Sequence, residues 1–104
     1  MPDPPTAVFV MNDMMAFGVV GALKDRGFAV PDDVSVHGFD YLPASRYLTP
    51  PLSTIALPLH TIGIKAAECV IKMTENHSET LAANDDFILL PCHHVKRDSV
   101  GMIQ

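Results

Sequence analysis

Three polar side chains with complementary hydrogen-bonding chemistry follow two short apolar segments of the sequence. Asn12 and Asp13 come directly after the run TAVFVM, and Asp40 comes directly after the run VSVHGF. An asparagine amide both donates and accepts hydrogen bonds, whereas an ionised aspartate only accepts them. Together they suit the hydroxyl or amine groups of a small polar ligand, and the two carboxylates argue against a phosphate.

Each of these side chains also has a purely structural explanation. Aspartate is a favoured helix N-cap, and a cap contributes about 1 kcal/mol, so Asp13 is first explained as the cap of the helix that follows. An aspartate after a strand is a common turn former, which is the alternative for Asp40. For Asn12 the structural and the ligand-binding explanations both stay open.

Hydrophobic spacing predicts the elements that position these residues. Residues 6–11 predict a strand buried on both faces, as in a parallel sheet, and residues 34–39 predict a second strand. Between them, helical spacing begins at Asp13 and stops at Gly27. Strand, helix and strand form a right-handed βαβ unit, so the fold class is α/β. Ligands of open parallel sheets bind at the carboxyl ends of the strands, where the three polar residues should share one edge.

The remainder of the chain contains a proline-rich loop, a helix and a closing segment. Prolines exclude a helix between residues 41 and 58, so this segment is predicted to be mostly loop, with one short extended piece at 53–57. Amphipathic spacing then predicts a helix over residues 59–76. The last predictions are a polar connector over 77–86, one or two strands over 87–90 and 94–96, and a frayed tail after Asp98.

Composition restricts the class of protein. A chain of 104 residues is expected to form one core. Seven Lys plus Arg against twelve Asp plus Glu give a formal charge of -5 without a basic run, so this chain alone should bind DNA poorly. Without a leader peptide or a membrane-spanning apolar run, we expect a soluble, cytoplasmic protein. Cys69 and Cys92 form no CxxC pair and are expected to be reduced and packed.

Residues 7–55, AVFVMNDMMAFGVVGALKDRGFAVPDDVSVHGFDYLPASRYLTPPLSTI, strongly resemble the effector-binding core of lac-repressor (LacI/GalR) family transcription regulators. The shared motifs occur in family order: a strand ending in Asn-Asp, the turn VPDD, a strand ending in GFD, and TPPLSTI. The tail LLPCHHVKRDS resembles the closing segment of the family. The resemblance implies the C-terminal part of a periplasmic-binding-protein-like (type I) domain. Its parts would be a ligand-side βαβ subdomain (6–57), a crossover helix (59–76) and closing strands (87–98).

The resemblance also implies roles for individual residues. Asn12 and Asp40 match positions that contact the effector in sugar- and purine-responsive members, and Asp13 adjoins them. Leu59 lies near the place where some sugar-binding members carry an aromatic that stacks on the ligand, which a leucine cannot do. Four residues match regions that pair two subunits, with packing inside the monomer as the alternative for each: Phe17, Gly21, Tyr47 and Leu48.

The function implied by the resemblance is effector binding and dimerisation in a LacI-type regulator. The expected partners are a small, sugar-like effector and a second copy of the chain, with no cofactor and no membrane. In the family the effector shifts the balance between two conformations, and operator DNA is bound through a headpiece. This chain shows neither that headpiece nor the second subdomain of the cleft, so we expect a fragment whose 59–76 helix favours self-association.

Other motifs suggest three rival functions. In Cys92-His93-His94, strand alternation lets at most Cys92 and His94 share a metal, which leaves a zinc site incomplete. A magnesium cluster of Asp13, Asp33 and Asp40 lacks the Lys, Thr or Ser that phosphate chemistry needs. Without a nucleophile elbow or a phosphate-binding glycine loop, an enzyme is not expected. The nearest alternative is a periplasmic-type sugar-binding protein that feeds a transporter.

Overall fold

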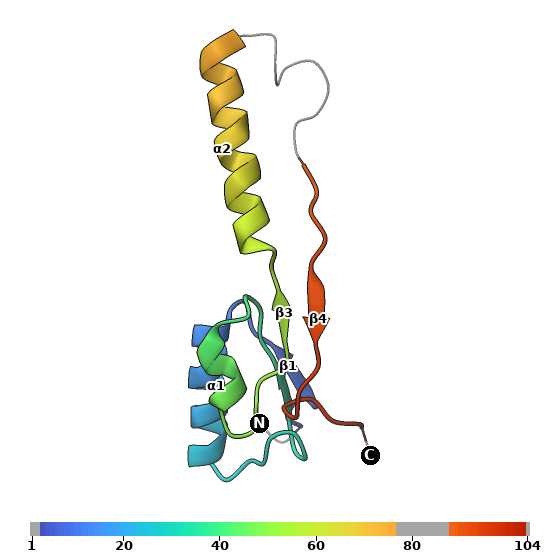
Figure 1. Ribbon diagram of the computed structural model, residues 1–104. Coiled ribbons are helices and arrows are strands. Elements are labelled where there is room, and N and C mark those ends of the chain that lie inside the picture. Colours follow the sequence, from blue (N-terminus) through green and yellow to red (C-terminus); the bar gives the residue numbers. More distant parts are fainter. Residues whose placement is uncertain (1–2, 77–87, 104) are drawn as a thin grey trace. The chain divides into compact units, whose positions relative to one another are not determined.

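The computed structural model describes residues 3–76 and 88–103 (Figure 1). The chain divides into two compact units, which comprise, among the described residues, 3–57 with 93–103 and 58–76 with 88–92. The elements in chain order are β1 (Ala7–Phe9), α1 (Asp13–Asp25), β2 (Ser35–His37), the 3-10 helix η1 (Pro43–Tyr47), β3 (Thr54–Ala56), α2 (Leu59–Asn76) and β4 (His93–Val95).

The first unit contains four short strands that lie side by side in the order β1, β2, β3, β4. β1 pairs with β2 in parallel, and β3 pairs with β4 in antiparallel fashion. A parallel bridge between His37 and Ser53 links β2 to β3, and the Gly38 N–H donates to the Ser53 carbonyl oxygen at 2.9 Å. The succession β1, α1, β2 confirms the predicted βαβ unit, with both strands shorter than predicted.

Local sequence signals set both ends of α1. The N-cap is Asn12, whose Oδ1 accepts a hydrogen bond from the Met15 N–H at 2.8 Å. The prediction that Asp13 caps this helix is wrong, because Asp13 is already its first helical residue. At the other end Gly27 has a φ of 84°, a left-handed conformation that glycine adopts without strain. The predicted stop at Gly27 is therefore confirmed.

The core of the first unit lies between α1 and one face of the sheet. Its buried apolar side chains are Val10, Ala16, Val20, Val36 and Leu52. Ala16 and Val20 stand four residues apart on α1, so they share the helix face that covers the strands. Figure 1 shows α1, in blue, on one side of the strands of this unit.

The opposite face of the sheet is open in the described part of the chain. Phe9 on β1 is 63 % exposed, and its ring lies 5.5 Å from that of His37. The prediction that residues 6–11 are buried on both faces is thus wrong. Side chains of a strand alternate between two faces, and α1 covers only one of them.

The C-terminal segment is anchored, and the prediction of a frayed tail after Asp98 is wrong. Ser99 is fully buried. Its Oγ accepts from the Ser53 N–H at 2.8 Å and donates to the Val36 carbonyl oxygen at 2.6 Å. One hydroxyl therefore joins the end of the chain to β2 and to the residue that precedes β3.

The second unit consists mainly of α2, whose bounds confirm the helix predicted over residues 59–76. Apolar side chains spaced along it are exposed, among them Leu59, Ile62, Val70 and Met73. Cys69 on this helix is a free, half-buried thiol, whereas Cys92 is free and exposed, so the expected packing of Cys92 is wrong.

Two further predictions concern the segment after α2. The predicted connector over 77–86 and Phe87 fall outside the described residues. Of the closing strands, the structure contains β4, while residues 88–90 form no strand. Within residues 3–76 and 88–103, neither α-helix combines the length and apolar character needed to span a membrane.

Candidate functional site

The two strand ends that carry the polar residues lie next to each other. β1 and β2 are adjacent and parallel, and the Asp13 N–H donates to the Phe39 carbonyl oxygen at 2.9 Å. Asn12 and Asp40 therefore flank one backbone hydrogen bond at the carboxyl edge of the sheet. This is the edge at which open parallel sheets bind their ligands. The structure thus brings Asn12, Asp13 and Asp40 together, as the sequence predicted.

Asn12 combines the two roles that the sequence left open. Its Oδ1 caps α1 through the Met15 N–H, while its Nδ2 still carries two hydrogens that can be donated. The side chain is half-buried at the sheet edge. Capping holds the amide in one orientation, so its donor groups have a defined direction.

Asp13 is a fully buried carboxylate whose two oxygens already have donors. Oδ1 accepts from the Thr54 hydroxyl at 2.8 Å, and Oδ2 accepts from the Leu42 N–H at 2.8 Å. Its position in the first turn of α1 also favours the negative charge through the helix dipole. A carboxylate enclosed in this way has no surface for an effector, which corrects the assignment of Asp13 as an effector contact.

Gly38 provides the space that the Asp13 carboxylate occupies. A Cβ at this position would lie much closer to Asp13 Oδ1 than van der Waals contact allows, and 2.9 Å from Leu52 Cδ2. Both neighbours are fully buried and cannot move aside freely. The glycine of the GFD motif is therefore required by the aspartate of the Asn-Asp motif.

Asp40 begins a turn of unusual backbone conformation. Its φ is 123°, and that of the following Tyr41 is 62°. Residues other than glycine rarely adopt positive φ, and such conformations concentrate at functional sites. The Asp40 side chain is half-buried, so its carboxylate still reaches solvent at the sheet edge.

Arg97 fastens the loop that follows this turn. One guanidinium nitrogen, Nη1, donates to Ser45 Oγ at 2.7 Å and to the Leu52 carbonyl oxygen at 2.9 Å. The guanidinium carbon also lies 5.4 Å from the centre of the Tyr41 ring, within the range of a cation–π contact. Arg97 in the closing segment of the chain thus helps to hold residues 40–45 in place.

No motif in the sequence predicts a role for Thr54, Gly38 or Arg97. All three lie inside the motifs STI, GFD and KRD that carried the family resemblance. Those motifs were the available signal, but only the three-dimensional contacts show what each residue does.

The remaining candidate residues are distributed over the molecule. Phe17 and Leu48 are half-buried against the core, which supports packing inside the monomer for these two. Gly21 and Tyr47 are exposed, Tyr47 to 78 %. Leu59 belongs to the second unit and is 61 % exposed, and its contact with an effector stays a prediction.

The structure separates Asp33 from the other two aspartates of the rival magnesium cluster. Among the described residues, no three His, Cys, Asp or Glu side chains are grouped to hold a metal ion. His94 Nε2 lies 3.0 Å from His37 Nε2, an arrangement that the CHH motif did not suggest. Asp33 Oδ2 accepts from the Ala29 N–H at 2.7 Å in the turn before β2, at the opposite end of the strand from Asp40.

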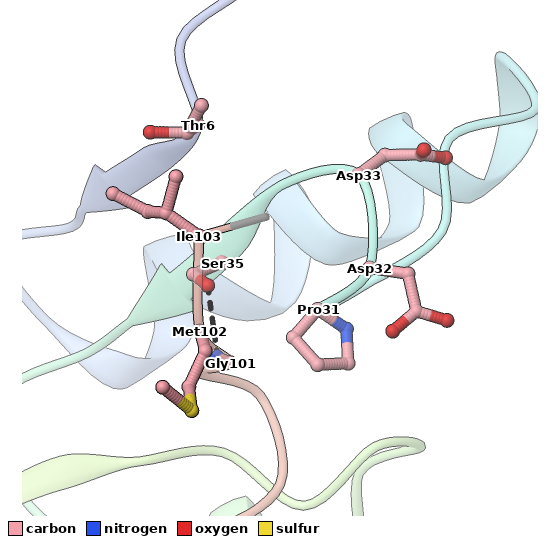
Figure 2. Close-up of a pocket in the computed structure, with 8 residues that line it drawn as sticks. All are labelled: Thr6, Pro31, Asp32, Asp33, Ser35, Gly101, Met102 and Ile103. Atoms are coloured by element: carbon pink, nitrogen blue, oxygen red, sulfur yellow. Dashed lines mark hydrogen bonds between the residues drawn. The ribbon is translucent and has the colours of Figure 1, made fainter.

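A small hollow lies at the amino ends of β1 and β2, away from the polar edge (Figure 2). Its lining includes Thr6, Asp32 and Ser35, and the Gly101 N–H donates to Ser35 Oγ at 3.0 Å across it. The volume is about 130 Å³. Ligand pockets start at roughly 300 Å³, so this hollow is too small for a sugar-sized molecule.

Residues 1–100 match the family model of the periplasmic binding protein-like domain. The chain is 40 % identical over 103 residues to the probable HTH-type transcriptional repressor ExuR of Bacillus subtilis. The alignment covers 96 % of this chain and 29 % of that repressor.

Solved structures of regulators share the fold. A LacI family transcriptional regulator from Enterococcus faecium, solved with bound ribose, matches with a TM-score of 0.82 and 28 % identity, over 99 % of this chain and 37 % of that one. The lac repressor dimer bound to operator and the anti-inducer ONPF matches with a TM-score of 0.79 and 32 % identity, over 92 % and 32 %. The chain spans about a third of the length of these relatives. It belongs to the periplasmic binding protein-like domain family, in the form found in LacI-type transcriptional regulators.

Proposed function

We propose that this chain forms part of the effector-binding and dimerisation domain of a LacI-type transcriptional regulator. One observation carries the proposal: Asn12 and Asp40 flank a single hydrogen bond at the carboxyl edge of β1 and β2. The regulators related to this chain favour a repressor over a sugar-binding protein that feeds a transporter. A cytoplasmic location follows from this proposal, because operator DNA is there.

The proposed effector is a small polyhydroxylated molecule such as a sugar. Asn12 Nδ2 supplies hydrogen-bond donors, and the Asp40 carboxylate supplies acceptors, so the pair complements hydroxyl groups that both donate and accept. A related regulator was solved with ribose, which has this chemistry. The Asp40 charge works against phosphorylated molecules.

The proposed regulatory mechanism is a shift between two conformations. An effector bound at the Asn12 and Asp40 edge stabilises the conformation in which it makes more contacts. The size of the shift is set by the difference in its affinity for the two conformations. A chain with a formal charge of -5 does not itself attract a phosphate backbone. In this proposal, operator binding belongs to a separate headpiece of the whole regulator.

The first prediction separates the two roles of Asn12. Aspartate is also a good N-cap, so Asn12→Asp should keep the stability of α1 while replacing the Nδ2 donors with a second carboxylate oxygen. We expect the melting temperature without ligand to stay within a few degrees and effector binding to disappear. The measurement is thermal unfolding with ribose, glucose, galactose, glucuronate and adenine at millimolar concentrations.

Wild-type protein is the reference in this experiment. A compound present at 100 times its dissociation constant should stabilise the wild type by about 2.7 kcal/mol. Asn12→Ala serves as the control, since it should lose both the cap, worth about 1 kcal/mol, and the donors. No stabilisation of the wild type by any compound in the panel would contradict the proposed function.

The second prediction concerns dimerisation. Tyr47 and Gly21 are exposed and match subunit-pairing regions of the family, so we propose that their surface pairs two copies. Tyr47→Glu should place an uncompensated charge in this contact and shift the molar mass toward that of a monomer. Sedimentation equilibrium at several concentrations measures the shift, with Met102→Glu, at an exposed position of the C-terminal segment, as the matched control. Equal dimerisation constants for the two variants would remove Tyr47 from the interface.

A further inference from the structure

The turn at Asp40 and Tyr41 is held in a conformation that its residues do not favour. The φ angles of 123° and 62° both lie in the region that L side chains rarely adopt. Such conformations persist only where the surrounding structure determines them. The contacts that determine this turn therefore also decide where the Asp40 carboxylate points.

Three consecutive backbone N–H groups anchor the turn. Each of them finds an acceptor outside the turn, and two of the three acceptors are side-chain oxygens. The bonds are Asp40 N to the Ile55 carbonyl oxygen at 3.0 Å, Tyr41 N to Thr54 Oγ1 at 3.3 Å and Leu42 N to Asp13 Oδ2 at 2.8 Å.

The two side chains that accept from the turn also bind each other. Thr54 and Asp13 are both fully buried, and the Thr54 hydroxyl donates to Asp13 Oδ1 at 2.8 Å. Because the hydroxyl proton points at the carboxylate, the lone pairs of Oγ1 remain for the Tyr41 N–H. Asp13 thus orients Thr54, and the two residues act on the turn as one unit.

We propose that Asp13 and Thr54 are a positioning pair that sets effector affinity without touching the effector. They hold the positive φ angles of residues 40 and 41, and this aims the Asp40 carboxylate at the sheet edge before any ligand arrives. A site formed in advance avoids the cost of ordering a loop on binding. The inference rests on the proposed function, since it concerns the same effector edge.

Thr54→Val tests the pair, because valine keeps the shape of threonine and lacks the hydroxyl. Thr54→Ser is the matched control, since it keeps the hydroxyl and lacks the methyl group. Affinity is measured by calorimetry at 10 °C with the panel compound that most raises the melting temperature of the wild type: ribose, glucose, galactose, glucuronate or adenine. We expect Thr54→Val to lose at least about tenfold in affinity and Thr54→Ser to stay close to the wild type.

A second measurement needs no ligand. A positive φ places the amide proton close to the α proton of the same residue, so Tyr41 should show a strong intraresidue nuclear Overhauser effect in the wild type and in Thr54→Ser. This signal should weaken in folded Thr54→Val. A role confined to stability would lower the melting temperature of Thr54→Val and leave the signal unchanged.

The outcomes separate the inference from the function on which it rests. If no panel compound binds the wild type, the proposed function fails, whatever the Tyr41 signal shows. If a compound binds and Thr54→Val keeps both its affinity and the Tyr41 signal, the inference alone fails. A Thr54→Val chain that is unfolded at 10 °C would assign the pair to the fold and also overturn the inference.

Discussion

Replacing Asp40 with glycine should abolish effector binding and leave the fold at least as stable as that of the wild type. The carboxylate is the charged acceptor of the proposed site, and each hydrogen bond to a charged group contributes about 1.5–3 kcal/mol. Losing two such bonds corresponds to a loss in affinity of more than about 100-fold. Glycine also relieves the φ of 123° at this position, where strain costs about 1–3 kcal/mol. Calorimetric titration and thermal unfolding measure the two effects separately.

Tyr41→Gly is the matched control for this experiment. Tyr41 has a φ of 62°, so glycine relieves strain there as well, yet the Asp40 carboxylate remains. We expect Tyr41→Gly to keep most of the effector affinity, with some loss from the missing contact between Arg97 and the ring. An Asp40→Gly protein that binds the effector like the wild type would exclude Asp40 from the site.

Gly38→Ala should be among the most destabilising single substitutions in this chain. The added methyl group would collide with the buried Asp13 carboxylate and lie 2.9 Å from Leu52 Cδ2. Overpacking of a core typically costs about 1–3 kcal/mol. Displacing Asp13 would also break its bonds to Thr54 and Leu42, and a buried polar group left without a partner costs about 1–3 kcal/mol more. We therefore expect a loss of about 2–6 kcal/mol in the free energy of unfolding, measured in urea.

Gly18→Ala provides the comparison for Gly38→Ala. Gly18 lies within α1, and a Cβ at this position would meet no atom within 4 Å. Alanine is a better helix former than glycine by about 0.8–1 kcal/mol, so this variant should be more stable than the wild type. Equal stability of the two alanine variants would mean that the Asp13 carboxylate can leave its place beside Gly38 at little cost.

Local patterns were sufficient for the two α-helices, but the prediction that prolines exclude a helix between residues 41 and 58 is wrong, because Pro43–Tyr47 form the 3-10 helix η1 with the proline in its first turn. Helical spacing and Gly27 predicted the extent of α1, and the amphipathic run over 59–76 predicted α2. These signals act over a few residues, because side chains three or four positions apart share a helix face and glycine relieves a left-handed turn. The adjacency of Asn12 and Asp40 followed from the parallel strands of the βαβ unit, whose carboxyl ends lie at one edge of the sheet.

Predictions that depended on distant partners were less successful. The anchoring of Ser99 comes from hydrogen bonds to Ser53 and Val36, 46 and 63 residues away, so no local pattern marked it as buried. The exposure of Phe9 depends on which face of the sheet a helix covers, while strand alternation alone treats both faces equally.

The sequence by itself determined the family, the βαβ unit and the edge at which Asn12 and Asp40 meet, because short-range spacing and ordered motifs specify all three. Only the tertiary structure decided the roles of the two adjacent polar residues: Asn12 caps α1 at the surface, and Asp13 is buried. Either residue type can cap a helix, so local chemistry does not choose between them. The choice comes from Leu42 and Thr54, 29 and 41 residues further along the chain, which supply the donors that a buried carboxylate requires.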